Sequence, residues 1–115
     1  MMSNDSGYVA GIVHHDAFDD LERCIASLRQ QTARPAAVAV VDTGADPARL
    51  AALAERHRDV DFLPRPNLGY GAGANYALRW TAEHLPAVPH VLILNPDVEL
   101  EPDFDPEGIW WGPLF

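Results

Sequence analysis

Short apolar runs alternate with helical stretches along this chain of 115 residues. Each stretch between two runs has apolar residues at helical spacing or the signals of a helix start. This alternation predicts an α/β domain with a parallel sheet, and right-handed crossovers favour a Rossmann-like, doubly wound arrangement. The last run is apolar at every position, which is typical of a strand covered on both faces. The predicted strands are residues 8–13, 37–41, 60–63 and 91–94.

Three helices are predicted between these strands. Asp16 is the expected N-cap of the first, and Asp46 followed by Pro47 is a strong signal for the start of the second. The third follows a glycine-rich stretch, begins near Asn75 and reaches about His84.

Length and composition favour one globular domain, since 48% of the residues are hydrophobic and 22% are charged. Its expected parts are a polar tail at 1–7, an α/β domain at 8–98 and an acidic, then apolar tail at 99–115. No apolar run approaches the ~20 residues of a transmembrane segment, and the N-terminus has no signal-peptide pattern. These features predict a cytoplasmic location.

The net charge is −9, and the chain contains no lysine. This excludes a basic footprint for nucleic acid or anionic lipid, so no nucleic-acid partner is expected. An acidic protein that binds an anionic nucleotide is expected to use backbone amides, a helix terminus or a metal ion. Cys24 is the only cysteine, which excludes an internal disulfide and a cysteine metal cluster, and it is interpreted as a small buried hydrophobe.

Polar residues follow three of the predicted strands. His14 and His15 come after the first strand, Asp42 after the second, and Asn95 and Asp97 after the fourth. In doubly wound sheets ligands bind beyond the carboxyl ends of the strands, so this edge is the expected site. Adjacent histidines in a strand point to opposite sides, which predicts that one faces the cleft and the other packs.

Each candidate also has a purely structural interpretation. Asp97 is well placed to hold Mg²⁺ or Mn²⁺ with help from Asn95, but Asn-Pro-Asp is also a turn sequence, and taken alone the turn is favoured. Asp42 either accepts hydrogen bonds from a nucleobase or ribose, or caps the turn into Thr43 and Gly44.

The stretch from Asn67 to Asn75 contains three glycines and opens a helix. Backbone amides there can face an anion, with Asn75 bonding back to the main chain, or the small residues serve only close packing. Residues 69–74 also fit the dinucleotide fingerprint GxGxxA. That match is weak, because it follows the third strand and lacks the expected acidic residue about 20 positions later.

Together these segments resemble family 2 glycosyltransferases of the GT-A fold, in particular their rhamnosyltransferase-like branch. Three motifs in order carry the resemblance, which extends over residues 8–98. They are Val40-Val41-Asp42, then Asn67-Leu68-Gly69-Tyr70 leading to Gly73-Ala74-Asn75, and finally Leu92-Ile93-Leu94-Asn95-Pro96-Asp97-Val98.

The resemblance implies a UDP- or dTDP-sugar donor and a transfer that inverts the anomeric carbon. Asp42 would contact the base, and Asp97, in that branch's version of the DxD motif, would bind Mg²⁺ or Mn²⁺ on the diphosphate. The full set of residues expected to bind the nucleotide-sugar is His14, Asp42, Asn67, Gly69, Asn75 and Asn95.

The sequence departs from this family after Asp97, where only 18 residues follow. The family's acceptor-binding half and its catalytic base are not recognisable, so we expect a donor-binding fragment or shortened form. The alternatives are a non-catalytic nucleotide- or partner-binding module on the same fold and a dinucleotide-dependent oxidoreductase fragment. The apolar end of the chain, residues 108–115, predicts a homodimer formed through this tail.

Overall fold

A computed structural model describes residues 7–100 and 102. Four parallel strands form one sheet in the order β3-β2-β1-β4, so the predicted α/β, Rossmann-like architecture is confirmed. The elements in chain order are β1 (Tyr8–His14), α1 (Phe18–Arg29), β2 (Ala37–Asp42), α2 (Pro47–Arg56), β3 (Asp61–Pro64), α3 (Tyr70–His84) and β4 (His90–Leu94).

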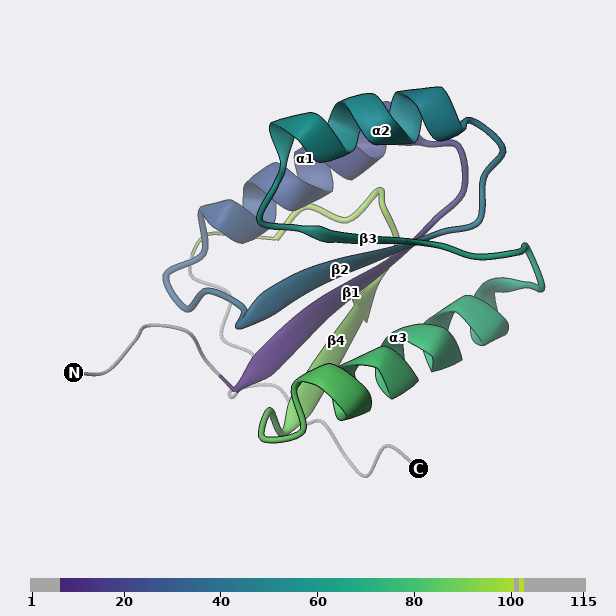
Figure 1. The fold of residues 1–115 in the computed structure, drawn as a ribbon. Coiled ribbons are helices and arrows are strands. Elements are labelled where there is room, and N and C mark those ends of the chain that lie inside the picture. The colour runs from purple at the N-terminus through teal and green to yellow at the C-terminus, as the bar shows by residue number, and fades with distance from the viewer. Residues whose placement is uncertain (1–6, 101, 103–115) are drawn as a thin grey trace.

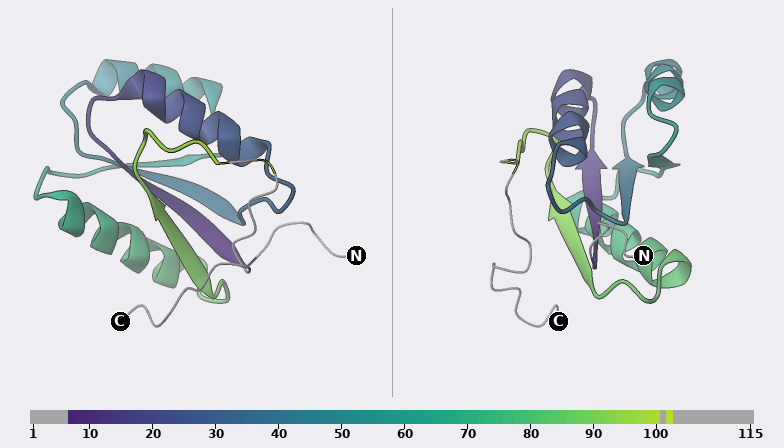
Figure 2. Two further views of the ribbon diagram at one scale, coloured as in Figure 1. Left: turned by 180° about the vertical axis from the view of Figure 1, so that it is seen from behind. Right: turned by 90° about the vertical axis from the view of Figure 1, so that its left-hand side faces the viewer.

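The helices cover both faces of the sheet, with α1 and α2 on one side and α3 on the other (Figures 1 and 2). The larger part of the core lies under α1 and α2, where alternate residues of the strands meet the apolar side of each helix. Its buried members are Ala10, Ile12, Phe18, Leu21, Cys24, Ile25, Leu28, Val40, Leu50, Leu53, Val60 and Leu94.

On the opposite face, α3 lies close to β1 because both elements have small residues at the contact. A Cβ atom built on Gly73 would lie 2.8 Å from Cγ1 of Val13, a distance shorter than real Cβ contacts. A Cβ on Gly11 would meet Ala77 and Ile93, each at 3.2 Å. The glycines therefore set the distance between this helix and the sheet.

The predicted start of α2 is confirmed, because the Asp46 carboxylate accepts a hydrogen bond from the Arg49 amide at 3.0 Å. The predicted cap of α1 is wrong. Asp16 adopts a left-handed conformation with φ 51°, and its carboxylate accepts instead from the Ala45 amide at 3.3 Å. The N-cap residue is Ala17, whose amide donates to the buried ring of His14.

Two further expectations are corrected. Helix α3 begins at Tyr70 and not near Asn75, so most of the glycine-rich stretch is helical. The all-apolar run of β4 belongs to an edge strand whose first four residues are only half-buried. Strand β3 is shifted by one residue, to Asp61–Pro64.

After β4 the chain turns back along α1 (Figure 2). The Leu100 amide donates to Ser27 Oγ at 3.2 Å, and the Thr32 amide donates to the Pro102 carbonyl at 3.0 Å. Beneath this segment Cys24 is fully buried, as predicted, and burial raises the pKa of its thiol to about 12. The expectations for the polar N-terminus and the apolar tail fall outside the described residues.

Among the helices of the described part, none is both long enough and apolar enough to cross a membrane.

Candidate functional site

A cavity of about 130 Å³ lies at the carboxyl edge of the sheet, where the sequence predicts the site. Its wall is formed by the ends of β1 and β2 and by the stretch that leads into α3. The lining residues are Val13, His14, His15, Thr43, Asn67, Gly69 and Tyr70.

A larger cavity, of about 230 Å³, lies at the opposite edge, between α1 and the starts of β2 and β3. Two arginines line it, Arg34 and Arg29, of which Arg29 is already bonded to Asp59, and the rest of the lining is mainly apolar. We assign the site to the smaller cavity, because it brings together polar strand ends and the N-terminus of a helix.

His14 and Asp42 form a buried pair at the floor of this edge. They occupy matching positions in the β1–β2 ladder, and His14 Nδ1 lies 2.7 Å from Asp42 Oδ1. His14 is 0% exposed and Asp42 is 4% exposed. The Ala17 amide donates to His14 Nε2 at 2.8 Å, so Nδ1 carries the proton and donates it to the carboxylate.

As predicted, one of the two adjacent histidines packs in the interior and the other is exposed. The one that packs is His14, which was expected to bind the nucleotide-sugar. The ring of His14 packs edge-on against Phe18, and both of its nitrogens are bonded within the protein. His15 is the exposed one, and its Nδ1 lies 3.1 Å from the Thr43 carbonyl oxygen. The residue placed to meet a ligand here is therefore His15.

Thr43 is a residue of this site that sequence reasoning missed. Its amide and its hydroxyl both donate to the His14 carbonyl, at 2.9 and 3.0 Å, which ties the exits of β1 and β2 together. The sequence did contain a signal for Thr43, because this polar residue directly follows Asp42 at the end of a predicted strand. Asp42 itself is 4% exposed and is not among the residues that line the cavity.

The other wall comes from the start of α3. Asn67 Oδ1 accepts a hydrogen bond from the Gly69 amide at 3.2 Å, and Gly69 has φ 99°, a conformation that suits glycine. Helical bonding begins only with the Gly73 amide, which donates to the Gly69 carbonyl at 3.2 Å. The amides before Gly73 in this first turn are therefore free of helical partners and point out of the helix N-terminus.

Asn75 does not brace this stretch. It lies within α3, and its exposed side chain forms no hydrogen bond with another described residue. The brace that the sequence predicted at Asn75 is provided by Asn67.

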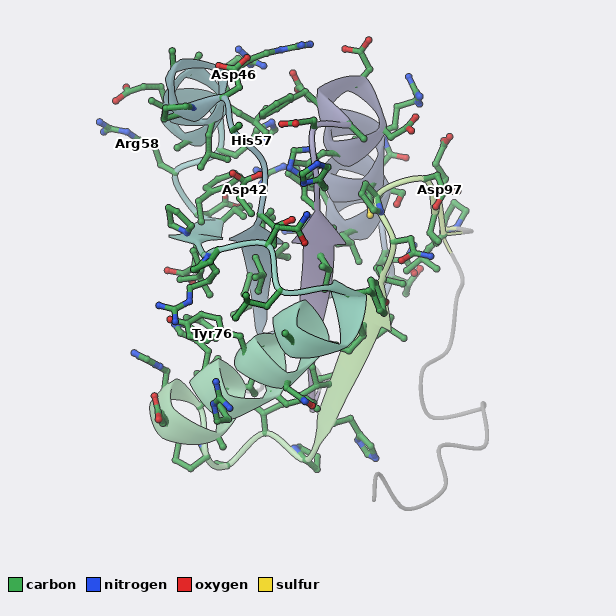
Figure 3. The ribbon with its side chains drawn as sticks, turned by 90° about the vertical axis from the view of Figure 1, so that its right-hand side faces the viewer. Asp42, Asp46, His57, Arg58, Tyr76 and Asp97 are labelled. Atoms are coloured by element: carbon green, nitrogen blue, oxygen red, sulfur yellow. The ribbon has the colours of Figure 1, made fainter. Side chains whose placement is uncertain are left out.

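Asn95 and Asp97 lie apart from the cavity. The Val98 amide donates to the Asn95 carbonyl at 3.1 Å, which closes a turn directly after β4. Asp97 is exposed on the segment beside α1, well separated from Asp42 (Figure 3). Its charge helps to raise the pKa of the Cys24 thiol, after burial itself.

No group of three or more His, Cys, Asp or Glu side chains in the described part of the chain is arranged to hold a metal ion. A cation at Asp97 would therefore depend on one carboxylate, the nearby Asn95 amide, water and substrate oxygens. Mg²⁺ is often bound in this way, through one or two carboxylates and phosphate groups.

Comparison with known proteins gives the family. The family model for glycosyl transferase family 2 matches residues 10–109. The chain is also 36% identical over 100 residues to the N-acetylglucosaminyl-diphospho-decaprenol L-rhamnosyltransferase of two strains of Mycobacterium tuberculosis, CDC 1551 / Oshkosh and H37Rv. The match covers 81% of this chain and 29% of each relative, so the chain spans under a third of their length. With its parallel α/β sheet and its matching motifs, the chain belongs to glycosyl transferase family 2.

Proposed function

We propose that this chain is the donor-binding part of an inverting glycosyltransferase that uses a UDP- or dTDP-sugar. The observation that carries the proposal is the cavity at the carboxyl edge, formed by β1, β2 and the N-terminus of α3 in a family 2 chain. The base would lie over the ends of β1 and β2. The diphosphate would lie toward the free amides that precede Gly73.

Asp42 would accept a hydrogen bond from the base through its second carboxylate oxygen, while His14 holds the first, Oδ1, in place. His14 is not a candidate for the catalytic base, because both ring nitrogens are bonded and the ring is buried. Asn67 and Gly69 would shape the wall on the phosphate side. Asn75, outside the cavity, has no part in this arrangement.

Asp97 and Asn95 would hold Mg²⁺ or Mn²⁺, which offsets the negative charge of the diphosphate when bound. Two observations support this assignment. The Asp97 carboxylate is exposed and forms no ion pair or hydrogen bond with another described residue, so it is available to a cation. The chain also has a net charge of −9, which disfavours an unaccompanied diphosphate.

The named relatives transfer L-rhamnose to a sugar linked through a diphosphate to decaprenol. We propose the same class of transfer for the protein to which this chain contributes, with rhamnose as the sugar to test first. The cytoplasmic location expected from the sequence stays a prediction.

Titration calorimetry with UDP and dTDP, with and without Mn²⁺, tests the donor site. We expect Mn²⁺ to strengthen binding, and Asp97→Ala to remove that gain with little change in melting temperature. Glu99→Ala is the control for a nearby exposed carboxylate, which differs from Asp97 in forming an ion pair with Arg23 at 3.8 Å.

Equal affinity with and without Mn²⁺ would remove Asp97 from its metal role. Binding of neither nucleotide would favour the non-catalytic module, and binding of NAD alone would favour the oxidoreductase alternative.

A homodimer is the second part of the proposal. Among the described strands, β4 pairs only with β1, so no described strand occupies its outer edge, and unpaired strand edges favour pairing with another chain. The apolar residues 108–115 would add buried surface to such a contact. Light scattering should show a dimer for the full chain and a monomer for a version that ends at Asp105. If both are monomeric at high concentration, the dimer proposal is wrong.

A further inference from the structure

The arginines of this chain divide into two groups. Five of the eight form ion pairs with carboxylates: Arg23, Arg29, Arg49, Arg56 and Arg58. The other three, Arg34, Arg65 and Arg79, have no carboxylate partner among the described residues. In a chain where 17 acidic residues outnumber 8 arginines, an arginine without an acidic partner is unexpected.

Two of these unpaired arginines meet at one place. Arg65 follows β3, Arg79 lies on α3, and both line a hollow of about 80 Å³ on the flank of that helix. The other lining residues are Pro66, Leu68, Ala72, Gly73 and Tyr76, so no acidic side chain lines it. Figure 3 shows Tyr76 on the flank of α3 that lies away from Asp97.

Tyr76 holds one of the two cations in place. The guanidinium carbon of Arg65 lies 4.3 Å from the centre of the Tyr76 ring, within the range of a cation–π contact. Stacking engages the flat face of the guanidinium and leaves its N–H edge free to donate hydrogen bonds. Arg79 is three residues after Tyr76, which puts both on the same side of α3. Glu83, one turn further on, forms no ion pair with Arg79.

The hollow also has room for a small group and an apolar side. A cavity needs at least about 10–15 Å³ to hold one water molecule, and this hollow, at about 80 Å³, is several times larger. Leu68 lines it and is 76% exposed, which makes it the most exposed large hydrophobic residue described. A ligand with an apolar or aromatic group beside its phosphate would cover Leu68 and bond both arginines.

We propose that Arg65, Tyr76 and Arg79 form a binding site for the phosphate or diphosphate of an organic ligand, separate from Asp97 and independent of a metal ion. Two guanidinium groups supply the positive charge, and charge-assisted hydrogen bonds from their N–H edges hold the phosphate oxygens. The stretch that supplies Pro66 and Leu68 to this hollow also supplies Asn67 and Gly69 to the carboxyl-edge cavity. The two sites therefore share a wall.

Calorimetry with inorganic pyrophosphate in EDTA and low salt tests the site on the full chain. We expect Arg65→Gln and Arg79→Gln each to weaken binding by about fivefold or more, and the double variant by more than about twentyfold. Arg34→Gln is the matched control, because Arg34 is equally exposed and unpaired but lies at the opposite edge of the sheet, and it should change affinity less than about twofold.

The arginine site is refuted if wild type fails to bind pyrophosphate at millimolar concentration, or if Arg34→Gln loses as much affinity as the other variants. Asp97→Ala should leave pyrophosphate binding unchanged, so failure of the metal-dependent donor site and failure of this site give different results. UDP and geranyl diphosphate, also in EDTA, then distinguish the source of the phosphate. Tighter arginine-dependent binding of UDP identifies a nucleotide, and tighter binding of geranyl diphosphate identifies a lipid-linked diphosphate.

Discussion

Replacing His14 by leucine should destabilise the fold more than any exposed substitution near the cavity. The change removes two hydrogen bonds, one to the Asp42 carboxylate at 2.7 Å and one from the Ala17 amide at 2.8 Å. It leaves a carboxylate that is 4% exposed and a backbone amide without these partners. Each buried polar group left unsatisfied costs about 1–3 kcal/mol, so we expect a loss of about 3 kcal/mol.

That loss is large but should leave the chain folded. At about 0.05–0.15 kcal/mol per residue, 115 residues correspond to a stability of about 6–17 kcal/mol. A destabilisation of 1 kcal/mol lowers the melting temperature by about 4–8 °C in a domain of roughly this size, so the expected fall is about 12–24 °C. Urea unfolding measures the free energy directly, provided that the slope with denaturant is unchanged.

A double-mutant cycle with Asp42→Leu distinguishes the pair from simple packing. Removing both partners eliminates the buried carboxylate, so the double variant should lose about 1–3 kcal/mol less than the sum of the single losses. His15→Leu is the control, because its side chain is 56% exposed, and it should lose less than about 1 kcal/mol. A loss below about 1 kcal/mol for His14→Leu, or strict additivity with Asp42→Leu, would refute the reasoning.

Three further measurements check other features of the structure. Gly73→Ala should lower the urea midpoint, because its Cβ would clash with a β1 valine, whereas Gly71→Ala, with no atom within 4 Å, should raise stability by about 0.5–1 kcal/mol. The hydrogen bond from Arg29 lowers the pKa of Asp59, so this pair stabilises the fold fully above the ordinary aspartate pKa of 3.8. The stabilisation is lost as the pH falls through the lowered pKa. Arg29→Gln should therefore lose less melting temperature between about pH 5 and pH 3 than wild type does. Cys24 should resist alkylation at about pH 8 until denaturant unfolds the chain, and rapid labelling without denaturant would contradict its burial and raised pKa.

The architecture was predictable because its signals are local. Strand runs, helical spacing and the Asp46–Pro47 start all lie within a few residues of the elements they specify. The start of α3 was not predictable, because glycine disfavours helices when considered alone. In the folded chain Gly73 is nevertheless helical, since only glycine lets the helix pack this closely against Val13. The apolar run of β4 likewise predicted full cover, but whether a strand is at the edge depends on the whole sheet.

The site was predictable as an edge of the sheet but not as a set of contacts. The bond between His14 and Asp42 joins residues 28 positions apart, and it depends on how β1 and β2 align. The sequence shows that both are polar residues at strand ends, but it does not show that they will be buried together as a hydrogen-bonded pair. The same holds for Arg65 and Arg79, which are brought to one hollow only by the packing of α3.

The two walls of the carboxyl-edge cavity differ in how firmly they are fixed. On one side, Thr43 is bonded twice to the His14 carbonyl, and Asp16 ties the next turn through the Ala45 amide. On the other side, the described hydrogen bonds of residues 66–69 are local, from the Gly69 amide to Asn67 and from the Gly73 amide to the Gly69 carbonyl. A ligand thus meets one surface held by three hydrogen bonds across the strand exits and one held by bonds within its own stretch, which binding can reshape at lower cost. Affinity differences among related ligands should therefore arise mainly at the Asn67 side, while the β1–β2 side selects what enters.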